Sequence, residues 1–168
     1  MMRVLVSAAS KYGSTTEIAE AIGKELSAAG HDVDVRPPAD VTSIESYDAV
    51  VLGSAVYVGH WLEPVRKLAK RERETLRQRP VWLFSSGPIG EPPMPTGDDA
   101  VDIADIVETI AAREHRIFSG KLDKHRLSFP ERAVVFALRV AEGDFRDWDA
   151  VASWGRDIAR QLAAEATR

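Results

Sequence analysis

A strand, a turn and a helix follow one another over residues 4–29, and this segment constrains the fold more than any other. Residues 4–6 read Val-Leu-Val, a short apolar run typical of a buried parallel strand. Over residues 18–29, Ile, Ala and Leu recur at about 3.6-residue spacing, which predicts an amphipathic helix with one core-facing side. Gly30 stands where glycine commonly ends a helix. The segment therefore predicts the first unit of an α/β fold.

The turn inside this segment is rich in hydroxyl groups, since residues 10–16 read SKYGSTT. The first amides of a helix have no partner within the helix, and the helix dipole favours negative charge there. These amides and hydroxyls together could hold a phosphate group. Alternatively, Ser14 or Thr15 could serve only to cap the helix. The segment by itself is compatible with both interpretations.

Two common nucleotide-binding motifs are absent from the turn. A Walker A loop requires a second glycine and a Lys-Ser/Thr pair at fixed offsets, and the turn has neither. The dinucleotide fingerprint requires three glycines, and only Gly13 is present. What remains suits a single terminal phosphate held by hydroxyls and amides.

Length and composition limit the number of domains and the classes of function that the chain can have. With 168 residues, 45% of them hydrophobic, we expect one globular domain over residues 1–168. The net charge of −4 argues against nucleic acid as a partner. The chain has no cysteine and no histidines at metal-ligand spacing, so we predict no disulfide and no metal site. Without a signal peptide or an apolar run of about 20 residues, a cytoplasmic protein is expected.

The rest of the chain alternates between strand and helix patterns. Strands are predicted at residues 32–36, 49–53, 80–85 and 116–118. Helices are predicted at residues 62–78, from Asp98 or Asp99 to 112, at 129–140 and at 147–164. Trp82, Trp148 and Trp154 are expected in the core. This alternation argues for a doubly wound parallel sheet.

Small or hydroxyl residues follow three of the predicted strands. Such sheets bind ligands at the carboxyl ends of their strands, where the strand order reverses. Ser54 and Ser85 stand at two of these ends, and the hydroxyl-rich turn stands at the third. Small residues there would let a flat ligand lie against the backbone, and Tyr57 or Trp61 could stack on it. We therefore expect one ligand site at this edge, with Tyr57 as the more favoured ring contact.

In their order and spacing, these residues resemble flavodoxin. The likeness rests on the hydroxyl-rich turn, on Gly53-Ser54 with an aromatic residue three positions later, and on the loop that begins at Ser85. Within that superfamily, the chain is similar to flavodoxin-domain proteins related to the menaquinone-dependent protoporphyrinogen oxidases. That similarity rests on Gly59-His60-Trp61, and on Gly143-Asp144 followed by Asp147-Trp148. The likeness covers nearly the whole chain.

The resemblance implies a flavodoxin-like, doubly wound, five-stranded parallel sheet of order 2-1-3-4-5, with helices on both faces and flavin mononucleotide (FMN) as cofactor. It further implies which residues contact FMN. The phosphate would be held by Ser10, Lys11, Tyr12, Gly13, Ser14 and Thr15. The isoalloxazine ring would be flanked on one side by Ser54, Ala55, Val56, Tyr57, Val58 and Gly59. The other side would be edged by Ser85, Ser86, Gly87 and Pro88.

The expected function follows from that cofactor. We predict an FMN-binding redox protein that acts as an electron carrier or as a flavin-dependent oxidoreductase, with a redox protein, a small molecule or a quinone as partner. A quinone-linked protoporphyrinogen oxidase-like dehydrogenase is the first alternative, and a flavin-free interaction module is the second. A phosphorylation-controlled receiver module would need acidic residues where Ser7-Ala8 and Gly53-Ser54 stand, so that class is excluded.

One apolar segment leaves a peripheral membrane contact open. Residues 129–138, with Arg126, Arg132 and Arg139, could form a membrane-facing or quinone-facing patch. A helix that packs on the sheet is the interpretation we favour for them. His60 could donate a proton beside a flavin, although a loop histidine is more often a surface residue.

Overall fold

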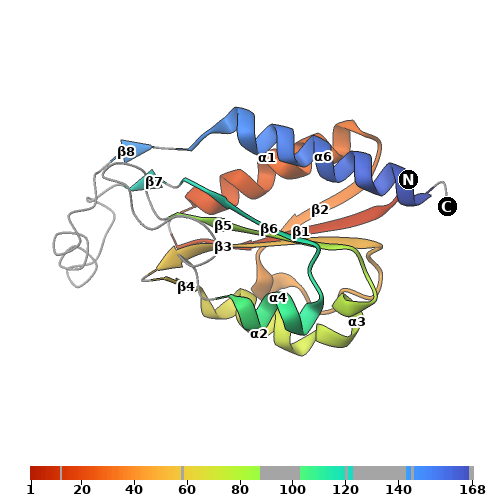
Figure 1. Cartoon of the computed structure of the whole chain (residues 1–168), viewed down its shortest axis with the longest axis horizontal. Helices are drawn as coiled ribbons and strands as arrows, with labels where there is room; N and C mark the ends of the chain where they lie inside the picture. Colours follow the sequence, from red (N-terminus) through yellow and green to blue (C-terminus); the bar gives the residue numbers. More distant parts are fainter. Residues whose placement is uncertain are drawn as a thin grey trace.

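The computed structural model describes residues 1–11, 13–57, 59–87, 103–119, 121–122, 143–144 and 146–166. Its centre is a parallel sheet enclosed by two layers of helices (Figure 1). The five main strands are β1 (Arg3–Ala9), β2 (Asp32–Arg36), β3 (Ala49–Tyr57), β5 (Val81–Ser86) and β6 (Glu114–Phe118). They lie in the order β2-β1-β3-β5-β6, and each neighbouring pair is parallel. Counted as main strands, this is the predicted order 2-1-3-4-5, so the fold class is confirmed.

Three short strands were not predicted. β4 (His60–Trp61) turns back along the end of β3 and pairs with it antiparallel. β7 (Lys121–Leu122) and β8 (Gly143–Asp144) form a separate two-stranded antiparallel sheet. β3 and β4 therefore form a short hairpin at the edge of the sheet where we expect the ligand.

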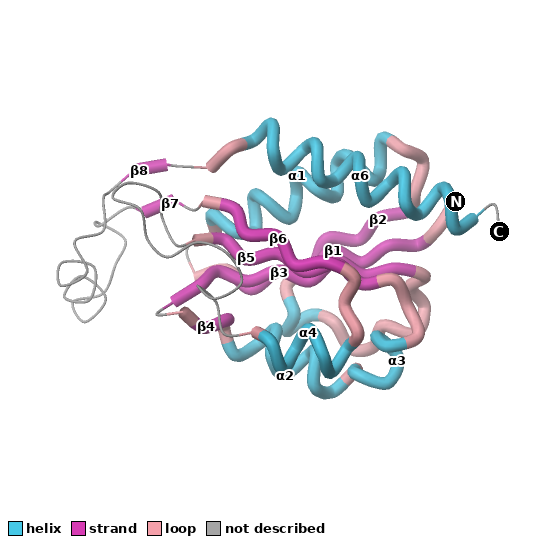
Figure 2. Tube along the Cα trace, in the orientation of Figure 1, coloured by secondary structure: helices cyan, strands magenta, loops and turns pink. Residues whose placement is uncertain are grey.

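The helices divide between the two faces of the sheet, as Figure 2 shows. One face is covered by α1 (Ser14–Ala28) and α6 (Trp148–Ala166), and the other by α2 (Glu63–Arg71), α3 (Arg73–Arg77) and α4 (Ala104–Ile110). In β1 the side chains alternate accordingly: Val4 and Val6 pack with α1 and α6, whereas Leu5 packs with α2. The strands are apolar on both faces because both faces are covered.

Aromatic side chains fill the core between the sheet and α6. Trp82 and Trp154 are fully buried, as predicted, and Phe84 contacts the Trp154 ring edge-on at a centroid distance of 6.1 Å. The prediction that Trp148 lies in the core is wrong, because Trp148 is 40% exposed. It begins α6 at the surface, where the Arg146 guanidinium stacks on its ring at 4.6 Å.

Several predicted boundaries differ from the structure. The single helix expected over residues 62–78 is divided at Glu72 into α2 and α3. In one straight helix, Leu76 would lie about 80° around the axis from Leu68; with the break, both leucines are buried. Strand β3 runs to Tyr57 rather than ending at residue 53, and α4 begins at Ala104, later than predicted. The helix expected over residues 129–140 lies outside the described residues.

Among the residues that the structure describes, no helix combines the length and the apolar character that crossing a bilayer requires.

Candidate functional site

The turn between β1 and α1 has the backbone geometry of an anion site. Gly13 adopts a left-handed conformation, with φ 91° and ψ −13°, and its amide donates to Ser10 Oγ at 2.9 Å. The helical ladder begins with the Glu17 amide, which donates to the Gly13 carbonyl at 3.1 Å. The amides of Ser14, Thr15 and Thr16 precede that bond and therefore have no carbonyl within the helix to pair with. Their N–H groups are available to an anion at this end of the dipole.

Thr15 is the most informative side chain of the turn. It is fully buried, and its Oγ1 has no hydrogen-bond partner among the described residues. A buried hydroxyl without a partner costs about 1–3 kcal/mol. The residue preceding the helix is Gly13, and no side chain caps it, so neither Ser14 nor Thr15 is a cap. A ligand that reaches the first turn could supply the missing partner of the Thr15 hydroxyl.

The end of β3 is fixed by Ser54. This residue is fully buried, its Oγ donates to the Ala55 carbonyl at 2.8 Å, and it accepts from the Leu62 amide at 2.9 Å. Leu62 immediately precedes α2. The Ser54 hydroxyl thus joins the end of β3 to the start of α2, and it leaves the Ser54 backbone as the part that can face a ligand.

The end of β5 is fixed by a buried polar chain that sequence reasoning missed. Trp61 Nε1 donates to Ser85 Oγ at 2.7 Å, and Ser85 Oγ lies 2.7 Å from His115 Nε2. Because Trp61 supplies the proton of the first bond, the Ser85 hydroxyl can donate its own to His115. Gly87 follows with φ 93°, and its amide donates to the Phe118 carbonyl at 2.8 Å. These contacts join β4, β5 and β6 at one edge of the sheet.

Strand register brings the three predicted segments together. Ala9 of β1 pairs with Ser54 of β3, and Ser54 pairs in turn with Ser85 of β5. The turn between β1 and α1, the β3–β4 hairpin and the end of β5 therefore lie side by side at the carboxyl edge of the sheet. The side chain of Tyr57 and all of Tyr12, Val58 and Pro88 lie outside what the structure describes.

Arg146 is a second group that sequence reasoning missed. Its side chain is only 4% exposed, and it pairs with Asp144 through Nε–Oδ1 at 2.8 Å and Nη2–Oδ2 at 2.7 Å. Its Nη1 reaches the first turn of α1, at 3.3 Å from the Ser14 carbonyl and 3.0 Å from Glu17 Oε2. Hydrogen bonding to Asp144, supported by Glu17, raises the pKa of Arg146 above its ordinary value. The bonds to Ser14 and Glu17 join residues 132 and 129 positions apart in the sequence, so no local pattern indicated them.

The donor set fits an FMN better than it fits a metal ion. Unpaired amides and the Thr15 hydroxyl suit a phosphate, and the small residues at the ends of β3 and β5 leave backbone to face a flat ring. Within the described residues, no three His, Asp or Glu side chains are grouped as metal ligands.

Comparisons with solved structures support the same fold. The chain superposes on a flavodoxin from the domain Archaea with a TM-score of 0.63 and 21% identity, covering 96% of this chain and 99% of that one. Oxidised flavodoxin 1 from Bacillus cereus gives a TM-score of 0.64 with 16% identity, covering 94% and 97%. Rubredoxin oxygen:oxidoreductase from Desulfovibrio gigas gives 0.68 with 15% identity, over 99% of this chain but 37% of that one.

Sequence comparisons extend the likeness. The chain is 25% identical over 175 residues to protoporphyrinogen IX dehydrogenase [quinone] of Escherichia coli K12, covering 94% of this chain and 95% of the relative. The family model described as a flavodoxin domain matches residues 5–149, which include all three segments of the site. The chain therefore belongs to the flavodoxin domain family.

Proposed function

We propose that this protein is an FMN-binding redox protein whose cofactor lies across the carboxyl edge of β1, β3 and β5. Flavodoxin-type folds bind FMN where β1 and β3 diverge, and this chain has both the family assignment and the strand order. The observation that carries the proposal is the buried, unpartnered Thr15 Oγ1 in the first turn of α1, which no side chain caps.

The residues of the β1–α1 turn have separable roles toward the FMN phosphate. The left-handed Gly13 lets the chain turn into α1, and Ser10 fixes that turn through the Gly13 amide. Ser14 and Thr15 offer amides, and Thr15 also offers its hydroxyl. Lys11, exposed at the rim, adds positive charge. Each of these contacts favours a phosphate over a neutral ring substituent.

The ring-side segments act mainly through their backbones. The Ser54 and Ser85 hydroxyls are engaged inside the protein, so they hold the ends of β3 and β5 in place. His60 is exposed on β4 at the same edge. Bound FMN supplies one-electron and two-electron transfer chemistry, and the protein sets its position and surroundings.

Electron transfer to a partner protein is the role that the site supports best. A quinone-linked dehydrogenase that acts on a protoporphyrinogen is the second candidate. The Escherichia coli relative that bears this name, and that the chain matches over nearly its whole length, favours it. A flavin-free interaction module is the weakest candidate, because it would leave Thr15 Oγ1 buried without a partner. A cytoplasmic location remains a prediction.

Two measurements test this proposal in sequence. The purified protein is first examined for a flavin absorbance band, with and without added FMN, and the bound flavin is then reduced anaerobically. We expect a band and reversible reduction. The FMN-loaded protein is next mixed with protoporphyrinogen and a menaquinone analogue. Complete oxidation of a protoporphyrinogen to a protoporphyrin removes six electrons, and each quinone accepts two. Loss of about three quinones for each protoporphyrinogen oxidised would therefore assign the dehydrogenase role, and no turnover with retained flavin reduction would favour the carrier.

A further inference from the structure

The charge of the protein is strongly asymmetric. The chain as a whole carries −4, yet residues 63–79 contain seven Lys and Arg against three Glu. These residues form α2, α3 and the turn that follows them, on the face of the sheet opposite α1 and α6. A concentrated charge of sign opposite to the rest of a protein creates a local field that can attract and orient a partner.

Two cations of α2 have side chains without partners in the part of the chain that the structure describes. Arg71, Arg77 and Arg79 hydrogen-bond through their side chains to backbone carbonyls at 2.7–3.4 Å. Arg66 and Lys70, by contrast, are exposed, and their side chains make no hydrogen bond or ion pair among the described residues. They stand four residues apart, so they project from one side of α2.

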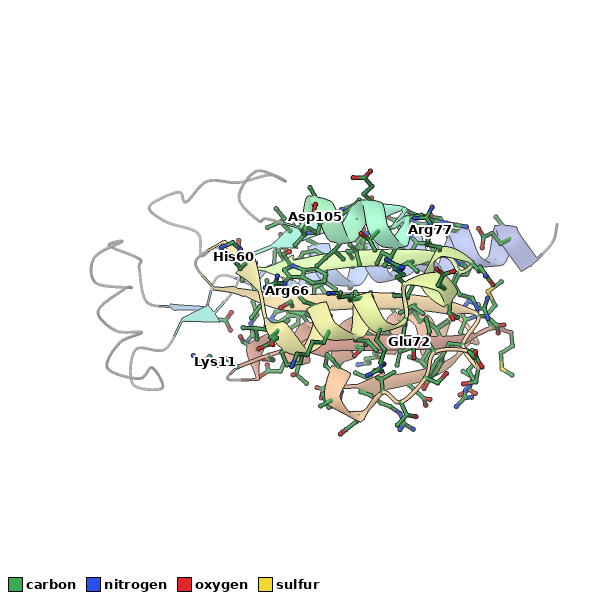
Figure 3. All side chains as sticks on the ribbon, turned by 90° about the horizontal axis from the view of Figure 1, so that it is seen from below. Lys11, His60, Arg66, Glu72, Arg77 and Asp105 are labelled. Atoms are coloured by element: carbon green, nitrogen blue, oxygen red, sulfur yellow. The ribbon has the colours of Figure 1, made fainter. Side chains whose placement is uncertain are left out.

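Arg66 and Lys70 lie on the helix that follows the candidate FMN site. Because α2 starts one residue after β4, Arg66 lies at the end of its first turn, close in sequence to the hairpin expected to flank the flavin. Figure 3 shows Arg66 and His60 toward the same end of the molecule, with Glu72 and Arg77 farther toward the opposite end. Lys67 pairs with Glu63 at 3.2 Å, through side chains that are 73% and 72% exposed. Because an ion pair so exposed to water is weak, Lys67 can still contribute positive charge to this surface.

We propose that the outer face of α2, centred on Arg66 and Lys70, is the docking surface for an acidic protein partner. Charge complementarity identifies the partner as acidic, and the adjacent hairpin places it at the flavin edge. That the partner is a redox protein rests on the proposed function; the binding itself does not.

A protein fits this face better than a membrane surface does. Lipid-binding amphipathic helices bury an apolar side in the bilayer, whereas the apolar side of α2, formed by Val65, Leu68 and Ala69, is buried in the core. Carboxylates also stand among these cations, because Glu63 pairs with Lys67 at 3.2 Å and Asp105 lies on α4, which packs against α2. A uniformly anionic lipid surface would repel these carboxylates, whereas a folded protein can place its own cations opposite them.

The test uses the full chain and a plant-type [2Fe–2S] ferredoxin as the acidic probe. Binding is measured by interferometry at about 20 mM and about 300 mM salt, where screening lengths differ several-fold. The variant is Arg66→Glu/Lys70→Glu. The matched control is Arg156→Glu/Arg160→Glu on α6, which changes the net charge equally through side chains 53% and 69% exposed. Retention of FMN is recorded separately by absorbance, so failure of docking and failure of cofactor binding are distinguishable.

We expect the α2 variant to weaken ferredoxin binding roughly ten-fold at low salt, and the control to change it less than about two-fold. Binding of the unaltered protein should fall at high salt. Equal losses in both variants would overturn the proposal, because net charge alone would then explain them. So would an absence of ferredoxin binding at low salt. Binding to phosphatidylserine vesicles but not to ferredoxin, lost in the α2 variant, would assign the face to a membrane instead.

Discussion

Replacing Arg146 with Gln should weaken FMN binding through the phosphate rather than through the ring. The guanidinium is 4% exposed and neutralises two carboxylates, those of Asp144 and Glu17, beside the first turn of α1. Gln keeps a side-chain donor but removes the charge. Both carboxylates would then act unopposed on a phosphate bound at the turn.

The size of the effect follows from the distances. Arg146 Nη1 lies 3.3 Å from the Ser14 carbonyl, and a phosphate on the first-turn amides would lie about one helical pitch, ~5 Å, beyond it. At roughly 8 Å, one charge and a phosphate dianion interact by about 1–4 kcal/mol between a water-like and a surface-like dielectric. Screening at physiological salt reduces this to about 1 kcal/mol. The FMN dissociation constant should therefore rise about five-fold.

Paired titrations with FMN and riboflavin provide the assay. Riboflavin lacks the phosphate, so its dissociation constant should change less than about two-fold in Arg146→Gln. Arg160→Gln, at an α6 side chain that is 69% exposed, is the control and should change neither. The FMN loss should also shrink at high salt. An equal loss of FMN and riboflavin affinity would refute the electrostatic reasoning, since it would show that Arg146 only supports the structure of the site.

Three further predictions concern single positions. Thr15→Val should weaken FMN binding by about 1–2 kcal/mol in a fluorescence titration without lowering the urea stability of the flavin-free protein, because its hydroxyl has no internal partner; a stability loss with unchanged affinity would contradict this. The Tyr47 hydroxyl donates to Asp34 at 2.7 Å and is the main cause that lowers the Asp34 pKa. A carboxyl with a lowered folded pKa stabilises the protein above its unfolded pKa, and that stability disappears as the pH falls through the folded pKa. Tyr47→Phe should therefore cost about 1 kcal/mol at pH ~7 in urea unfolding, and the difference should shrink as the pH falls through the lowered pKa of Asp34; a difference independent of pH would argue for packing instead. Gly53→Ala would place a Cβ 2.2 Å from the buried Phe84 ring, so thermal unfolding should show a loss of about 1–3 kcal/mol, and an unchanged midpoint would show that the ring moves freely.

Local pattern was enough to predict the layers of the fold. Apolar runs and 3.6-residue periodicity depend on burial, which is set by which faces of the sheet are covered. The second strand was predicted at residues 32–36 and is found at Asp32–Arg36. The break at Glu72 was not predictable in this way, because it depends on how Leu68 and Leu76 reach the sheet together.

The site was predictable only in part, for a similar reason. Small or hydroxyl-bearing residues after an apolar run indicate the end of a strand at a ligand site. The β1–α1 turn, Ser54 and Ser85 could therefore be predicted from the sequence. His115 contacts a partner 30 residues away, and Arg146, besides its local pair with Asp144, contacts residues 129 and 132 positions away. Their contacts depend on strand register and on the approach of the segment before α6 to α1, which no periodicity encodes. From the sequence alone, a histidine or an arginine at such a position cannot be distinguished from an ordinary surface residue, because its distant partners are not known.

The most direct test of the central claim is a titration of the unaltered, flavin-free protein with FMN and with riboflavin, followed by quenching of flavin fluorescence. If the phosphate lies at the first turn of α1, FMN should bind in stoichiometric amounts, and riboflavin should bind at least roughly ten-fold more weakly, as expected when charge-assisted hydrogen bonds are lost. Equal affinity for the two flavins would place the phosphate elsewhere. No quenching by micromolar FMN would contradict the redox function itself.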